Sequence, residues 1–373
     1  MTAAAWGQPI HLELRGNDPA LVGELAKADE DAVVLTLRGE PRVIGWDRVR
    51  RVSPDTAAPR ELLARGEQLW RARVRVEKGD YAGAEPLLDD LSLIYMGRTG
   101  PTAAAFALTL LECRLNRGAH AQAVVAMVAY AGAVGEGRDQ WQEPTSAREP
   151  RLGQLPAALV WDETWGLSPL TPPMWVDIPA VRAFAREAIP AAPGRATALA
   201  SLYKASAAFE CGELVVMPEA RGSDPGLQLV FDIVAARTGE ADVRREARGR
   251  LQGRIQSDTP AWLAGWCLAA IGRSLLVEAD RDQRLLGVAE LLAIPAVHER
   301  LNPGLTALCL AQAAVAMDDL GDTQGAQTLR NELTMKFPAH PIRGWNRLMQ
   351  GPRRSSVPPT APKSDEPHTG GPS

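Results

Sequence analysis

Near its start, the chain alternates hydrophobic and polar residues with the period of two expected of half-buried strands. Stretches of turn-forming residues at 16–19 and 39–41 separate the alternating runs. Gly23 lies inside the second run, at a point where a strand is expected to bend. The alternating hydrophobic positions are Ile10, Leu12, Leu14, Val33, Leu35 and Leu37. This pattern predicts a small antiparallel β unit over residues 1–53, either a curled sheet or a barrel.

A proline-containing linker at Ser53–Pro59 ends the alternation. Beyond it, hydrophobic positions recur at the three- and four-residue spacing of amphipathic helices. The spacing predicts helical hairpins over residues 59–134 and again over residues 180–350. The clearest helical runs are Ala103–Leu115, Ala121–Tyr130, Ala196–Phe209, Leu227–Ala236, Val243–Ile255, Trp262–Val277, Leu285–Ile294, Leu305–Leu320 and Thr323–Phe337. The predicted fold class is therefore mostly α, with an α-α hairpin array preceded by the β unit.

Glycine marks three of the predicted turns between paired helices. A helix commonly ends at a residue in the left-handed conformation, which glycine adopts without a Cβ clash. A small residue five positions later lets the two helices approach closely, and a proline stops the last of them. These positions are Gly79 with Ala84, Gly118 with Ala123, and Gly321 with Ala326 and Pro338. They are expected to be structural residues, and Gly321 is expected to have a positive φ.

The turns resemble those of the tetratricopeptide repeat family, whose helix pairs carry Gly at the turn, Ala five residues on and a closing Pro. Gly79 through Ala84 and Gly321 through Ala326 match that pattern best. The aromatic residue of the family's first helix is missing from each copy. The spacing from Gly79 to Gly118 also exceeds the family's period of about 34 residues. The resemblance implies a solenoid of repeats, and the alternative is an ordinary helical bundle. The β unit resembles SH3-like and Sm-like barrels in its alternation alone, so no binding residue is inferred there.

Residues 135–179 break every period and form a Pro/Trp-rich insertion with seven prolines and four of the ten tryptophans. We expect an ordered segment lying on the helical surface, since disordered segments are poor in aromatic residues. Its candidate ligand-binding residues are Trp161, Asp162, Glu163, Trp165 and Trp175. Tryptophans beside carboxylates can stack on a sugar ring or hold a cation. The alternative is that the tryptophans pin the insertion onto the helices. Residues 351–373, rich in Pro, Ser and Gly, are expected to form a disordered tail.

Composition narrows the class of protein further. The formal net charge of −4 argues against a nucleic-acid-binding protein. The four cysteines are far apart and form no metal-binding or redox pair, so we expect no metal and no cofactor. No apolar run is long enough to span a membrane, and no signal peptide precedes the β unit. We therefore expect a cytoplasmic protein, although a mis-assigned start codon could hide a signal peptide. The oligomeric state is left open.

Motifs of enzyme chemistry are absent from the sequence. His298-Glu299 has no second histidine at metal spacing, and the remaining histidines are scattered singly. Neither a nucleophile elbow nor a phosphate-binding loop is present. The sequence therefore favours a non-enzymatic scaffold that binds a partner protein or peptide in the groove of its helical array. The alternative is a carbohydrate- or small-ligand-binding protein, or an enzyme, that uses the insertion from Trp161 to Trp175.

Overall fold

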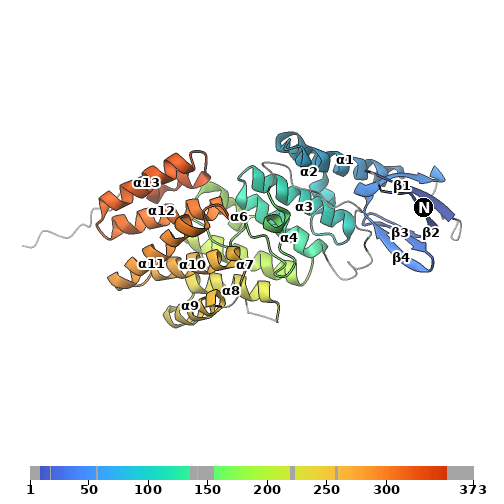
Figure 1. Cartoon of the computed structure of the whole chain (residues 1–373). Helices are drawn as coiled ribbons and strands as arrows, with labels where there is room; N and C mark the ends of the chain where they lie inside the picture. The colour runs from blue at the N-terminus through green and yellow to red at the C-terminus, as the bar shows by residue number, and fades with distance from the viewer. Residues whose placement is uncertain are drawn as a thin grey trace, which may run out of the picture.

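The structure, a computed structural model, describes residues 9–16, 18–55, 58–134, 141, 155–218, 223–256 and 259–350. It consists of helical hairpins preceded by a five-stranded antiparallel sheet (Figure 1). This confirms the predicted fold class. The predicted tail at 351–373 and the insertion residues 135–140 and 142–154 lie outside the described residues.

The β unit is a meander with one return strand. Its strands are β1 (Pro9–Leu14), β2 (Leu21–Ala28), β3 (Val33–Leu37), β4 (Glu40–Ile44) and β5 (Val49–Ser53), and the short helix η1 (Trp46–Arg48) precedes β5. The strand order is β4-β3-β2-β1-β5, so β4 and β5 form the edges. A Cβ on Gly23 would lie 2.5 Å from the Leu37 side chain, so this glycine permits close approach of β3. The irregularity in pairing comes slightly later, between Leu25 and Lys27.

The β unit packs on the first helices through Trp46. This side chain is fully buried and donates its indole N–H to the Asp29 carbonyl. A Cβ on Gly66 would lie 2.3 Å from the Trp46 carbonyl oxygen, so only glycine allows the first helix to approach this closely. The Trp46 backbone N–H donates to the hydroxyl of Thr102, which in turn donates to the Asp31 carbonyl. The hydrophobic cluster of the β unit extends to Ala58 and to Leu62 of α1, so it is continuous with the start of the helices.

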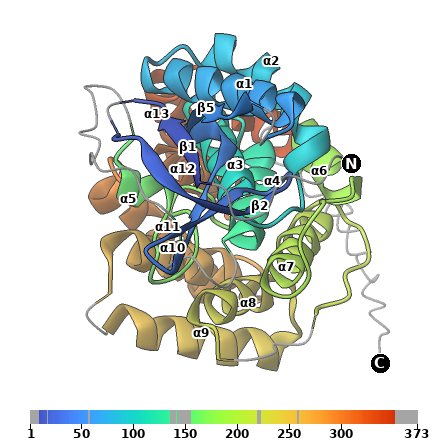
Figure 2. The same ribbon diagram turned by 90° about the vertical axis from the view of Figure 1, so that its right-hand side faces the viewer.

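The helices form a curved stack of antiparallel neighbours (Figures 1 and 2). Their bounds are α1 (Arg60–Glu77), α2 (Tyr81–Tyr95), α3 (Pro101–Asn116), α4 (His120–Ala133), α5 (Ala157–Val160), α6 (Pro179–Arg186), α7 (Arg195–Glu210), α8 (Pro225–Thr238), α9 (Ala241–Gln256), α10 (Ala261–Leu275), α11 (Arg281–Ala293), η4 (Ile294–His298), α12 (Pro303–Asp319), α13 (Thr323–Lys336), η5 (Pro341–Gly344) and α14 (Asn346–Gln350). Among the described residues, no helix has the length and apolar character needed to cross a membrane.

The three glycine turns have the geometry that the sequence predicts. Gly79, Gly118 and Gly321 have φ values of 77°, 70° and 90°. At each turn, the residue after the glycine donates its N–H back across the turn, as Asp322 does to the Met317 carbonyl at 2.9 Å. The side chain of Asp322 then caps α13 by accepting from the Gly325 N–H. The small residues Ala84, Ala123 and Ala326 are all fully buried. Helix α13 ends at Lys336, shortly before Pro338.

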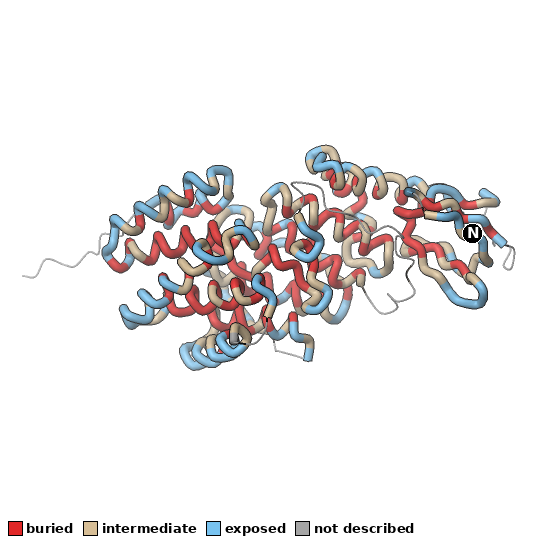
Figure 3. Tube along the Cα trace, in the orientation of Figure 1, coloured by how far each residue is buried: buried red, intermediate tan, exposed pale blue. Residues whose placement is uncertain are grey.

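Burial is concentrated in the inner helices. Helices α3, α4, α10 and α12 are buried along most of their length, whereas α9 and α13 expose a wide face (Figure 3). Arginines of α9 form ion pairs with residues outside this helix, for example Arg250 with Asp232 of α8 and Arg248 with Glu278 in the turn after α10. These pairs balance part of the positive charge on the exposed face of α9.

Candidate functional site

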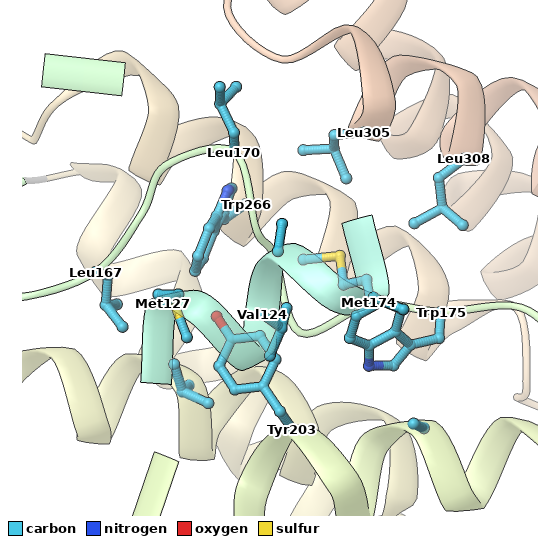
Figure 4. Close-up of a cluster of buried hydrophobic side chains, with 14 of the residues drawn as sticks. Val124, Met127, Leu167, Leu170, Met174, Trp175, Tyr203, Trp266, Leu305 and Leu308 are labelled. Atoms are coloured by element: carbon cyan, nitrogen blue, oxygen red, sulfur yellow. The ribbon is translucent and has the colours of Figure 1, made fainter. Parts of the chain in front are cut away.

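The centre of the helical array is occupied by an extended stretch of the insertion, residues 167–176. It runs between α4, α7, α10 and α12, with Leu170, Met174 and Trp175 directed at the surrounding helices (Figure 4). Leu167 and Ser168 are fully buried. We expected this part of the insertion to lie on the helical surface, and that expectation was wrong for residues 167–176. We call this stretch the threaded segment.

Side chains of the helical array donate hydrogen bonds to every second carbonyl of the threaded segment. The donors are Trp266 Nε1 (2.9 Å) and Asn302 Nδ2 (3.0 Å) to Pro169, Tyr203 Oη (2.6 Å) to Thr171, Ser206 Oγ (2.7 Å) to Pro173, and Arg273 Nη2 (2.7 Å) to Trp175. The three prolines of the segment have no N–H, so they bring few donors into the interior. Because the helices supply donors in return, these four buried carbonyls are satisfied without forming a sheet or helix.

A buried ion cluster holds the end of the threaded segment. Arg273 on α10 is only 2% exposed and pairs with Glu210 on α7, which also pairs with Arg237 on α8. Burial lowers the pKa of Arg273 to about 10, which leaves it charged at neutral pH. Burial alone would raise the pKa of Glu210, but the two guanidinium groups lower it below its usual value. The cluster therefore stays ionised and fixes the ends of three helices around the Trp175 carbonyl.

The predicted ligand-binding residues do not all meet at one place. Trp161 is buried and packs edge-on against Tyr130, with ring centroids 4.6 Å apart. The Asp162 carboxylate accepts from Trp262 Nε1 at 3.0 Å and from the backbone N–H groups of residues 164 and 165. Trp165 packs edge-on against Trp262, and Glu163 is exposed. These contacts place Trp161, Asp162 and Trp165 in one region beside α10. Their rings and the carboxylate pack against, or bond to, other residues of the chain there.

Trp175 lies apart from those residues, against Phe184 and Tyr203. It lines a cavity of about 190 Å³ beside the threaded segment. The walls come from the start of α4, residues 170–178, the start of α6, the start of α12 and residues 340–342. Most of the wall atoms are apolar, and the cavity adjoins the surface at the exposed residues Gln122 and Pro341.

Two histidines interrupt the apolar wall of the cavity. His120 begins α4 and His340 precedes η5, and their ring centroids are 5.7 Å apart. His340 Nδ1 accepts from the Ile342 backbone N–H at 3.2 Å. Burial lowers the pKa of His120, and burial together with His120 lowers the pKa of His340 to about 4. Both rings are therefore neutral at pH 7. In the sequence each of these histidines stands alone, and nothing local to either residue indicates the pairing.

Other reactive side chains are held in unreactive states. Burial raises the pKa of the Cys113 thiol to about 11 and those of Cys267 and Cys309 to about 12, so these thiols remain protonated. Within the described ranges, no cluster of three or more His, Cys, Asp or Glu side chains could hold a metal ion.

Comparisons with protein-family models, curated proteins and solved structures found no match to this chain. The tetratricopeptide resemblance therefore stays a prediction, and the functional argument rests on the geometry of the threaded segment and the cavity.

Proposed function

We propose that this protein is a non-enzymatic interaction module that binds a partner protein or peptide through its helical array. The observation that supports this most directly is the way in which the helices bind the threaded segment. Helices α7 and α10 hold an extended chain by donating side-chain hydrogen bonds to alternate carbonyls, while its side chains enter apolar spaces. Backbone bonds that give affinity and pockets that select side chains are the general means of recognising extended peptides.

A partner would engage the part of the array that the chain leaves unfilled. The threaded segment already fills the centre, but the cavity beside Trp175 is formed jointly by this segment and by α4, α6 and α12. A partner side chain entering there would contact surfaces that are continuous with the core. Helical hairpin stacks commonly present their inner surfaces to partners in this way.

Site-specific photo-crosslinking tests the proposal in the cell that makes the protein. A photoreactive amino acid replaces Gln122 at the cavity rim, and in a matched variant it replaces Gln252 on the outer face of α9. Both positions are exposed on helices. We expect a defined partner to crosslink at position 122 and to be absent at position 252. The crosslinked peptide, once sequenced, is then synthesised and its affinity for the purified chain is measured.

Cavity-filling variants decide whether this binding uses the cavity. Ala180 lines the cavity on α6, whereas Ala183 on the same helix is exposed. Ala180→Phe should weaken binding of the synthetic peptide by roughly tenfold or more, a loss of about 1.4 kcal/mol. Ala183→Phe should leave it unchanged. Equal crosslinking at positions 122 and 252, or equal affinity of the two phenylalanine variants, would count against the proposal.

Small-ligand binding is the second candidate, and the position of Trp175 in the cavity wall favours it. Trp161, Asp162, Glu163 and Trp165 would contribute as a separate subsite beside α10. Saturation-transfer NMR with monosaccharides and disaccharides tests this candidate. Saccharide binding that is lost on Trp175→Ala or Trp161→Ala would favour it over the interaction module.

A further inference from the structure

The two cavity histidines have polar capacity that the fold does not use. Within the described residues, the buried Nε2 of His340 has no hydrogen-bond partner, although the ring lines the cavity. The neighbouring ring of His120 is packed tightly, because a Cβ on Gly304 would lie 2.8 Å from His120 Cε1. His340 is positioned by the Ile342 N–H bond to its Nδ1. An enclosed imidazole without a partner is costly, which makes it a candidate for pairing with a ligand.

The size of the cavity limits what can enter. A volume of about 190 Å³ is close to that of engineered apolar cavities of about 150 Å³ that bind benzene. It is well below the roughly 300–1,000 Å³ of sites that hold drug-sized ligands or cofactors. One six-membered ring with a small substituent therefore fits the space, and a nucleotide or a disaccharide does not.

We propose that the cavity binds a single hydroxylated aromatic ring, and that this ring is the side chain of a tyrosine in the partner. The inference rests on the proposed interaction function and names the chemistry of its anchor. The ring would pack against apolar residues such as Val181 and Leu308, and its hydroxyl would pair with His340 Nε2. A neutral imidazole can both donate and accept, so it suits a phenol.

The same chemistry disfavours other anchors. A phenylalanine would fill the space but leave His340 Nε2 unpaired, and a carboxylate would bury a charge among apolar walls without a cation. Tyrosine is also among the residues that most often dominate binding energy at interfaces. The exposed rim at Gln122 and Pro341 gives such a side chain a way in from the surface.

Fluorine NMR on the full chain tests the chemistry of the site with two probes, 4-fluorophenol and fluorobenzene. We expect both to bind, and 4-fluorophenol to bind about three- to tenfold more tightly because of its hydrogen bond. Ala180→Phe should abolish binding of both probes, and Ala183→Phe should preserve it. His340→Phe keeps a ring in place and should make the two affinities equal. If His340→Phe does not fold, the two alanine variants and the two probes still decide the question.

Tripeptides identify the source of the ring. Gly-Tyr-Gly should displace 4-fluorophenol, and Gly-Phe-Gly should do so about three- to tenfold less well. Binding of the phenol with no displacement by Gly-Tyr-Gly would overturn the assignment to tyrosine. Absence of 4-fluorophenol binding, or equal affinity of both probes in the unmodified chain, would overturn the inference itself. A crosslinked partner whose peptide lacks tyrosine at the cavity would also overturn it while leaving the interaction function standing.

Discussion

Removing one hydroxyl from the interior tests whether the threaded segment is held by its carbonyl bonds. Tyr203 is fully buried, and its hydroxyl donates to the Thr171 carbonyl at 2.6 Å. Tyr203→Phe removes this bond and keeps the ring, so the hydrophobic contribution stays almost unchanged. The variant leaves a buried carbonyl without its donor, which costs about 1–3 kcal/mol. We expect the free energy of unfolding to fall by an amount within that range.

Tyr95 provides a matched control. It is 1% exposed and its hydroxyl, although buried, has no hydrogen-bond partner among the described residues. Tyr95→Phe removes the same atom from an equally enclosed site but breaks no bond. Because a buried unpaired hydroxyl is itself unfavourable, the free energy of unfolding should stay the same or rise. The two substitutions should therefore act in opposite directions or differ by at least about 1 kcal/mol.

Urea denaturation followed by circular dichroism measures both free energies, provided that the denaturant slopes of the variants agree. Hydrogen exchange then locates the effect. Amides of residues 167–178 should exchange faster in Tyr203→Phe and at the original rate in Tyr95→Phe. Equal losses of stability in the two variants, or unchanged exchange in Tyr203→Phe, would refute the view that side-chain donors hold the segment.

Two further predictions concern the turn and the histidine pair. Gly321→Val should destabilise the protein by about 1–2 kcal/mol through its positive φ alone, since the added Cβ meets nothing within 4 Å. The control Gly253→Val, on the exposed helix α9, should not carry this cost. Chemical denaturation measures the free energy of unfolding of both variants. The pKa of His340 is lowered to about 4 in the folded chain, whereas it is about 6.5 in the unfolded chain. The unfolded chain therefore binds the extra proton between these pH values. The free energy of unfolding should fall as pH drops from about 6.5 toward 4, by at most about 3 kcal/mol. His340→Asn keeps an acceptor for the Ile342 N–H and should flatten this dependence relative to His11→Asn, as measured by denaturation at several pH values.

The features that sequence analysis predicted correctly depend on neighbours in the chain. The turn at Gly321 needs a glycine for its positive φ, an acid to cap the next helix and a small residue to pack. All three lie within six residues, so the pattern is visible without tertiary structure. The strands were equally accessible, since alternation of hydrophobic residues directly reflects a sheet with one buried face.

The threaded segment could not be placed in the same way. Its Pro-rich composition correctly indicated that no helix or strand forms there. The groups that satisfy it, such as Tyr203, Asn302 and Arg273, come from helices far along the chain. One local sign was available, because Arg273 interrupts an apolar helix and yet is 2% exposed. A charge on the buried face of a helix indicates a buried partner but does not identify it.

The threaded segment also determines where a partner can bind. An open groove would have been the expected binding surface of a helical array, but here the chain fills its own groove with buried, hydrogen-bonded backbone. Displacing that segment would expose the side-chain donors that hold it and the Arg273 ion cluster, each at a cost of about 1–3 kcal/mol or more. Competition with the segment is therefore unfavourable for any partner of ordinary affinity. The cavity beside Trp175 carries no such cost, because it is already formed and the Nε2 of His340 in its wall is unpaired among the described residues. Under the proposed function, binding at the cavity would therefore let the array recognise a partner without unfolding its own core.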